Sequence, residues 1–302
     1  MSGYFANLAA YQPQKPTAMN HIVVGIDFSK SSVKAFEYAL NVASVTGSDL
    51  KLIYVKKDRD VHNVLPEGSK GLPTSIEKGF KNLIEKNKEA FSGEISYRIF
   101  TGKIYEEVTN FAKYTESSMI IAGAHGMSGF EEFWAGNNAI KIITHANKPV
   151  ITLKKNYKIK PKAIEKIVIP IDSTFETTQK VPFTIELAKK FKAQINILSL
   201  YSSRMKNIEQ RVDNSTKETL ALVIKSGLRH INEKAECENI TQATIDYALK
   251  RNADMISIMT EQEFSSHTVV MGSYAQQMVN QSPIPVLSNK TRILVPQDAI
   301  IE

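Results

Sequence analysis

The chain has 302 residues, of which 42% are hydrophobic and 23% charged, the composition of a globular protein large enough for two domains. Its net charge is +7, but the lysines are scattered over both halves, so we expect neither a nucleic-acid nor an anionic-lipid surface. One cysteine, Cys237, excludes an intrachain disulfide, and no apolar run approaches the length of a membrane span, so we expect a cytoplasmic protein without a membrane partner.

Residues 1–20 contain two prolines and lack the apolar middle of a signal peptide, so we expect a loose N-terminal arm there. Apolar runs then predict strands at 21–26, 50–55, 95–99, 119–122 and 149–153. Helical spacing predicts a first helix capped by Ser29 or Ser31 and ended by Gly47, and later helices at 75–91, 104–112 and 140–146. Residues 58–74, with two prolines and two glycines, are expected to be mostly loop. This order predicts an α/β fold, a mostly parallel five-stranded sheet sandwiched by helices.

The same pattern begins again at Glu165, so the sequence is a tandem repeat. The interval from Asp27 to Val55 equals the interval from Asp172 to Leu200, so the first strand, helix and second strand align without a gap. We therefore predict an arm at 1–20, one domain at 21–155 and a second copy of that domain at 164–290.

A glycine-rich turn follows the fourth strand of the first copy. It reads Gly123-Ala-His-Gly126, then nine residues, then Gly136-Asn137 before a helix. Glycines between a strand and a helix let main-chain N–H groups approach an anion, so the turn is a candidate phosphate cradle. Glycine at such a turn also serves simply to make the turn, and both interpretations stand at this point.

Three features in order resemble the universal stress protein family. They are Gly-Ile-Asp-Phe-Ser at 25–29, Leu-Ile-Tyr-Val at 52–55 and the late Gly-x2-Gly-x9-Gly-polar motif. The resemblance covers both halves and implies a Rossmann-like fold of the HUP, or adenine nucleotide alpha hydrolase-like, type. The Walker motif and an early Gly-x-Gly-x2-Gly are both missing from the sequence.

The resemblance implies ATP or a related adenine nucleotide, with or without Mg²⁺, at the carboxyl ends of the parallel strands. Asp27 would accept a hydrogen bond from the adenine or sugar edge, Val55 would contact adenine through its main-chain groups, and the glycines would admit ribose and phosphates. Asn137 stands where the family usually has Ser or Thr, so weaker phosphate binding is expected. The implied contacts are Gly25, Ile26, Asp27, Val55, Ala122, Gly123, His125, Gly126, Gly136, Asn137 and Asn138.

The second copy departs from this motif. Met259 and Gln262 stand where the first copy has its two glycines, and Glu261 replaces the histidine. Side chains would fill the space of a phosphate, and a carboxylate would repel it. Only Gly272-Ser273 survives, so we predict one competent nucleotide site per chain, in the first copy.

Other roles remain open for two of these residues. Asp27 could simply cap the following helix, and His125 could be a polar loop residue rather than an acid or base. The six histidines show no metal-ligand spacing, and no catalytic elbow or paired Cys/His signature is found, so we predict no metal site and no catalytic residue.

Three functional hypotheses follow. The first is a non-enzymatic, nucleotide-responsive stress regulator that acts on an unknown protein partner. The second is a weak ATPase or phosphotransferase that uses the same site, and the third is an interaction or scaffold protein without a ligand. By the same resemblance, the last strands of the copies, 150–153 and 286–288, are expected to pair within one molecule as a pseudo-dimer, and a homodimer of chains is left open.

Overall fold

The computed structural model of the protein describes residues 19–56, 71–124, 137–161, 163–260, 262–265 and 268–291. The first half consists of β1 (His21–Gly25), α1 (Lys30–Thr46), β2 (Asp49–Lys56), α2 (Gly71–Glu85), β3 (Ile95–Thr101), α3 (Ile104–Tyr114), β4 (Met119–Gly123), α4 (Asn137–His145) and β5 (Val150–Leu153). The second half repeats the order with β6 (Lys166–Ile171), α5 (Val181–Phe191), β7 (Gln194–Tyr201), α6 (Lys206–Ser226), β8 (His230–Glu236), α7 (Ile240–Lys250), β9 (Met255–Thr260), β10 (Gln262–Ser265), β11 (Thr268–Met271), α8 (Ser273–Gln281) and β12 (Val286–Lys290).

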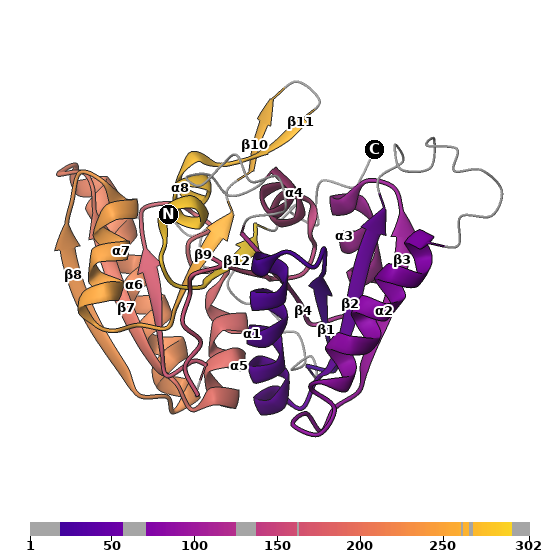
Figure 1. Cartoon of the computed structure of the whole chain (residues 1–302). Coiled ribbons are helices and arrows are strands. Elements are labelled where there is room, and N and C mark those ends of the chain that lie inside the picture. Colours follow the sequence, from indigo (N-terminus) through magenta and orange to yellow (C-terminus); the bar gives the residue numbers. More distant parts are fainter. Residues whose placement is uncertain are drawn as a thin grey trace, which may run out of the picture.

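The two halves share one continuous sheet, with strand order β3-β2-β1-β4-β5-β12-β9-β6-β7-β8 (Figure 1). Within each half the strands of this ten-stranded sheet run parallel. At the centre, β5 and β12 pair antiparallel, with Leu287 opposite Ile151. The predicted α/β fold and the predicted pairing of the last strands are therefore confirmed.

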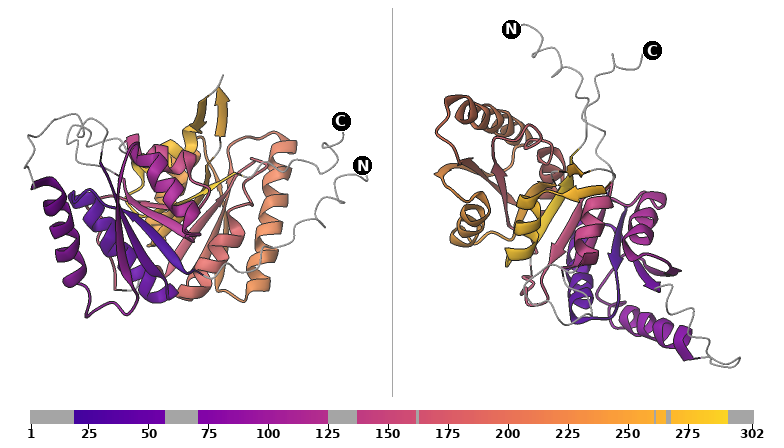
Figure 2. Two further views of the ribbon diagram at one scale, coloured as in Figure 1. Left: turned by 90° about the vertical axis from the view of Figure 1, so that its right-hand side faces the viewer. Right: turned by 90° about the horizontal axis from the view of Figure 1, so that it is seen from above.

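Helices cover both faces of this sheet (Figures 1 and 2). One core cluster gathers buried residues of α1, α2, α5 and α6 under one face, and the other gathers those of α3, α4, α7 and α8 under the opposite face. Successive strand residues alternate between the clusters, as Ile22 and Val23 do, and both are fully buried. Strands buried on both faces explain why the sequence shows continuous apolar runs rather than alternation.

Local sequence signals mark both ends of α1. Ser29 is the N-cap of α1 and accepts from the Ser32 N–H, and Gly47 ends that helix at a φ of 72°, a left-handed conformation that glycine adopts at low cost. The expectation that 71–74 is loop was wrong, because α2 already begins at Gly71. Pro73 lies in the first turn of α2, where its missing N–H would have no partner in the helix, so it does not delay the start. The helix ends at Glu85 rather than at residue 91.

The segment between the halves is tied to both of them. Asp254, 1% exposed, accepts from the Lys160 ammonium at 2.5 Å and from the main-chain N–H groups of Glu165 and Lys166 at 2.8 and 2.9 Å. The Tyr157 ring meets Tyr38 of α1 edge-on, with centroids 6.0 Å apart. The connection thus anchors the start of β6 and packs on the first half.

A two-stranded hairpin precedes the last helix of the second half. Between β9 and α8, where the first copy has its glycine-rich turn, β10 and β11 form an antiparallel hairpin in which Gln262 pairs with Met271 and Ser265 with Thr268. The sequence interpretation contained no hairpin here.

Candidate functional site

The connectivity of the first half places a topological switch point between the carboxyl ends of β1 and β4, the position at which open α/β sheets form a ligand crevice. The polypeptide leaves β1 through α1 toward β2, whereas β4 leads through α4 to β5 on the other side. Helices on opposite faces diverge at such a switch point, and ligands of open α/β sheets bind there. The predicted contacts Gly25, Ile26 and Asp27 lie on one side of this point, and Ala122 and Gly123 lie on the other.

Asp27 forms the turn that joins β1 to α1. Its Oδ1 accepts from the Ser29 N–H at 3.0 Å, and its own N–H donates to Ser32 Oγ at 3.2 Å. The cap of α1 is therefore Ser29, while Asp27 closes the turn before it. Among the described residues, Asp27 Oδ2 takes part in no hydrogen bond, so one carboxylate oxygen is available as an acceptor in the half-exposed crevice.

Phe28 adopts a left-handed backbone conformation with a φ of 60°, which is uncommon for a bulky residue. Its ring packs against Phe80 at 5.1 Å and Tyr54 at 6.0 Å between centroids, and it lies close over Gly79 of α2. Aromatic packing of this kind offsets the cost of the strained backbone and holds the turn after β1 in place.

Val55 presents main-chain groups to the same crevice. The Ile26 N–H donates to the Ile53 carbonyl at 2.8 Å, so the backbone of Ile53 faces β1. Residues two apart in a strand face the same side, so the N–H and C=O of Val55 point the same way. The β1 register ends with Gly25 opposite Ile53, and no described strand residue lies opposite Val55 on that side. These groups can hydrogen-bond a ligand edge.

Gly123 lies where the first turn of α1 crosses the end of β4. A Cβ at Gly123 would come within 2.8 Å of both the backbone carbonyl carbon and the carbonyl oxygen of Ser31. The glycine therefore has a packing reason that exists without any ligand. Ala122 beside it is buried, 5% exposed.

The remaining predicted contacts belong to the turn and to the start of α4. His125, Gly126 and Gly136 lie outside the described residues. Asn137 is the first residue of α4 and Asn138 is exposed. The amino end of a helix has N–H groups without a partner inside the helix, so the amino end of α4 is the candidate phosphate end of the site.

In the second half the turn after the first strand is similar, but the residue at the end of β9 and the start of the following helix differ. Asp172 Oδ1 accepts from the N–H of Thr174 at 2.9 Å and from its hydroxyl at 2.6 Å. Met259, 4% exposed, takes the position of Gly123. The helix that would cross it starts late, because α5 begins at Val181 whereas alignment with α1 would start it at Phe175. A start at Phe175 would place Pro182 in the helix interior, where proline removes a hydrogen bond and kinks or breaks the helix.

A model of the universal stress protein family matches residues 19–154 and 163–288. The protein belongs to the universal stress protein family. Universal stress protein MJ0531 of Methanocaldococcus jannaschii is 28% identical over 141 residues, which cover 45% of this sequence and 83% of that protein. A universal stress protein of Archaeoglobus fulgidus shares the fold over 90% of this protein and 98% of its own length, with a TM-score of 0.69 and 17% identity. A universal stress protein solved in complex with cAMP matches 46% of this protein and all of its own length, with 17% identity and a TM-score of 0.37.

Sequence reasoning missed a buried polar cluster in the second universal stress protein domain. Lys180, 2% exposed, donates from Nζ to the carbonyl and hydroxyl oxygens of Thr177 at 2.5 and 3.0 Å. Thr184 Oγ1 lies 2.7 Å from Ser257 Oγ, and Asn289 Nδ2 donates to that serine at 3.3 Å. The signal was readable, because Lys180 aligns with the fully buried Ala35 of the first domain. Its hydrogen bonds within the turn before α5 indicate a structural role there.

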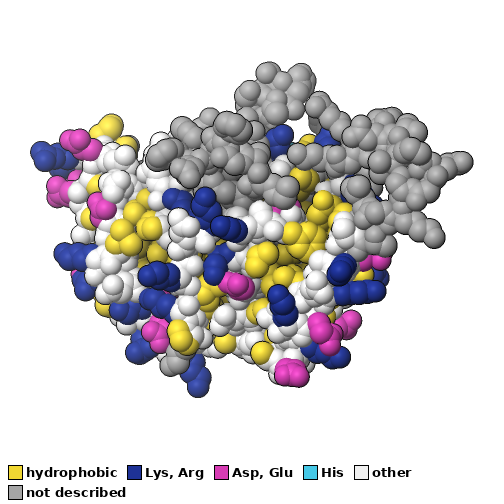
Figure 3. All heavy atoms as spheres, viewed as in Figure 1, with side chains coloured by type: hydrophobic (Ala, Val, Ile, Leu, Met, Phe, Trp, Pro, Cys, Tyr) yellow, Lys and Arg dark blue, Asp and Glu magenta, His cyan; other side chains and the backbone are white. Residues whose placement is uncertain are grey.

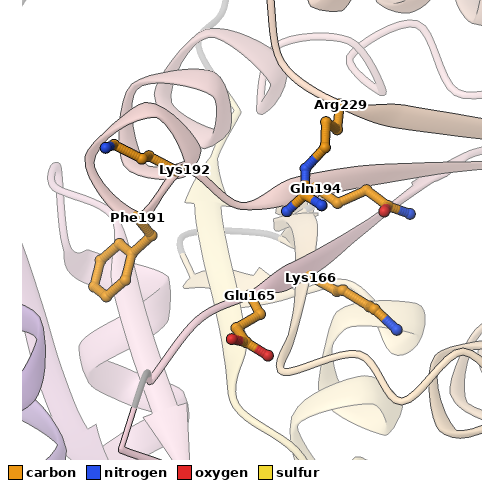
Figure 4. Close-up of a pocket in the computed structure, with 6 residues that line it drawn as sticks. All are labelled: Glu165, Lys166, Phe191, Lys192, Gln194 and Arg229. Carbon is orange, nitrogen blue, oxygen red and sulfur yellow. The ribbon is translucent and has the colours of Figure 1, made fainter.

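Two pockets are found among the described residues, and neither is lined by Asp27, Val55 or Gly123. One of about 580 Å³ is lined by Glu165, Lys166, Phe191, Lys192, Gln194 and Arg229 (Figure 4). It opens at the amino ends of β6 and β7, the opposite edge from the one where such sheets bind ligands, and beside the carboxyl end of α5. A shallower one of about 360 Å³ lies on the outer side of α1 and is lined by Phe28, Lys30, Val33, Lys34, Glu37 and Lys155. We assign neither pocket to the nucleotide.

The described residues also show how far the protein meets the requirements of a charged binding surface, a metal site and a membrane span. On the face shown in Figure 3, lysine and arginine side chains lie dispersed among other types rather than in one stripe. Within the described part of the protein, His, Cys, Asp and Glu side chains form no group suited to a metal ion. None of the described helices has the length and apolar character needed to cross a membrane.

Proposed function

We propose that the first domain binds an adenine nucleotide in the crevice between β1 and β4 and that the protein acts as a nucleotide-responsive binding protein rather than an enzyme. The observation that carries the proposal is the set of main-chain groups at Val55. They face the space beyond the end of β1, where Asp27 follows the strand with an Oδ2 that takes part in no hydrogen bond among the described residues. Together they offer one donor and two acceptors, which match the hydrogen-bonding edge of adenine or the hydroxyls of ribose.

Family membership and the position of α4 support the same assignment. The family resemblance implies an adenine nucleotide, and the amino end of α4 follows the glycine-rich turn at the same edge of the sheet. Phosphates would bind there through N–H groups and the positive end of the helix dipole. Mg²⁺ would bind mainly through the nucleotide phosphates, as it does in most nucleotide sites.

The second domain is proposed to lack a nucleotide site. Met259 occupies the position of Gly123, and the polypeptide proceeds into the β10–β11 hairpin instead of a glycine-rich turn. In this proposal, occupancy of the first domain changes the surface that the molecule presents to a protein partner.

The test is calorimetric titration of the purified full-length protein with ATP, in the presence and absence of Mg²⁺. We expect one site per molecule, and Asp27→Ala should weaken binding at least about tenfold, the effect of losing one well-placed hydrogen bond to a ligand. Asp172→Ala is the matched control, because it removes the carboxylate from the equivalent turn of the second domain. It should leave the affinity unchanged.

Two results would overturn the proposal. One is a parent protein that binds no adenine nucleotide at millimolar concentration. The other is a reversed pattern, in which Asp172→Ala abolishes binding and Asp27→Ala does not. Sustained release of phosphate from ATP by the parent would instead favour the weak ATPase hypothesis.

A further inference from the structure

Helix α4 is held by both halves of the protein. It packs against α3 and β5 of the first half, and against β11 and β12 of the second. Its buried side chains, Ala139, Ile142, Ile143 and Thr144, are at most 5% exposed. A nine-residue helix is too short to be stable on its own, so these contacts decide whether it forms.

The β10–β11 hairpin supplies one of these contacts. The hairpin lies in the second domain at the sequence position where the first domain has its glycine-rich turn. Its strand β11 lies beside α4 of the first domain (Figures 1 and 2). The hairpin has four residue pairs and, among the described strands, it pairs with no other. Because isolated two-stranded hairpins are marginally stable, its placement must depend on the elements it packs against.

From this arrangement we infer that the second domain controls the nucleotide site of the first through the β10–β11 hairpin, which stabilises α4 by packing against it. The inference rests on the proposed function, since it concerns the same site. The amino end of α4 would bind phosphate only while the helix is formed, so an element that stabilises α4 raises nucleotide affinity. Linkage requires the converse, and bound nucleotide must stabilise the packing of the hairpin on α4.

The hairpin can be shortened while the residue pair nearest to β9 and α8 is kept. Gln262 and Met271 are the first pair of the hairpin, and Met271 is buried, 2% exposed. Replacing residues 263–270 by Asn-Gly joins this pair through a two-residue turn. The matched control replaces only residues 266–267 by Asn-Gly, which retains all four pairs from Gln262–Met271 to Ser265–Thr268.

Hydrogen exchange and ATP titration of the full-length variants test the inference. We expect the shortened hairpin to speed amide exchange in 137–145 by about tenfold and to weaken ATP binding by a similar factor, as for a typical coupling between sites. Amide exchange in α3 should not change, and the control variant with Asn-Gly at 266–267 should behave as the parent protein does. ATP should slow exchange in 262–271 of the parent.

The failures are distinguishable. Unchanged amide exchange in 137–145 after the hairpin is shortened would show that the hairpin does not stabilise α4, whether or not ATP binds. Faster exchange with unchanged ATP affinity would overturn its control of the site. A parent that binds no ATP would overturn the proposed function and the regulatory part of this inference together, while the exchange data would still decide whether the hairpin stabilises α4.

Discussion

Gly123→Ala separates the packing role of this glycine from any role in ligand binding. The added Cβ would lie 2.8 Å from the backbone carbonyl carbon and the carbonyl oxygen of Ser31, whereas an ordinary carbon contact needs about 3.5 Å. The first turn of α1 would have to move by about 0.7 Å, and overpacking of this kind typically costs about 1–3 kcal/mol. Because two of the contacted atoms belong to the backbone, adding Ser31→Ala should not restore stability.

Gly25→Ala is the matched control, since Gly25 ends the neighbouring strand and no atom of the described residues outside its chain neighbours lies within 4 Å of its added Cβ. Neither glycine has a positive φ, so both replacements are compatible with the backbone. Urea unfolding of nucleotide-free protein should therefore show Gly123→Ala to be about 1–3 kcal/mol less stable than Gly25→Ala. Equal stability of the two variants would refute the packing explanation and leave close ligand approach as the reason for glycine.

Two further predictions concern the connection between the halves. Burial and the nearby Asp254 carboxylate raise the pKa of Tyr157 from 10.0 to about 12. Because the folded protein favours the neutral phenol, the contribution of this group to stability is fully present below pH 10 and is lost as the pH rises toward 12. Since the Tyr157 hydroxyl has no hydrogen-bond partner among the described residues, Tyr157→Phe should change stability little at pH 7 and flatten its decline above pH 10, as measured by urea unfolding across that range. Asp254→Ala removes the acceptor of two main-chain N–H groups and should cost about 1–3 kcal/mol for each one left buried. Lys160→Met should cost less than about 1 kcal/mol, because the lysine side chain is 47% exposed; equal losses for the two variants would contradict this division.

Periodicity and the internal repeat were sufficient to predict the architecture. Strands buried on both faces produce apolar runs, and Ser29 and Gly47 mark the first helix with side-chain and backbone chemistry that acts locally. The pairing of β5 with β12 followed from the family resemblance rather than from any local signal. The early start of α2 was missed because a proline in a first turn looks in sequence like a proline in a loop.

The candidate site was less accessible to sequence reasoning. The acceptor at Asp27 could be named from its place after a strand, but the orientation of the backbone at Val55 depends on the register of β1 against β2. The packing role of Gly123 depends on how α1 crosses β4, which no spacing rule gives. The β10–β11 hairpin left a weak signal, since Thr268-Val-Val-Met271 is rich in β-branched residues, and it was overlooked because the first copy has glycines there.

The divergence of the second domain is a coupled change rather than the loss of single ligand contacts. In the first domain Gly123 lets Ser31, in the first turn of α1, lie directly on β4. With Met259 at that position, a helix turn could not lie so close, and Pro182 moves the start of α5 to Val181. Replacing Met259 by glycine would therefore leave a cavity and not a nucleotide site, because the helix turn that covers the strand end would still be missing. Under the proposed function, the turn of the second domain has no phosphate to bind, which leaves it free to form the hairpin that packs on α4.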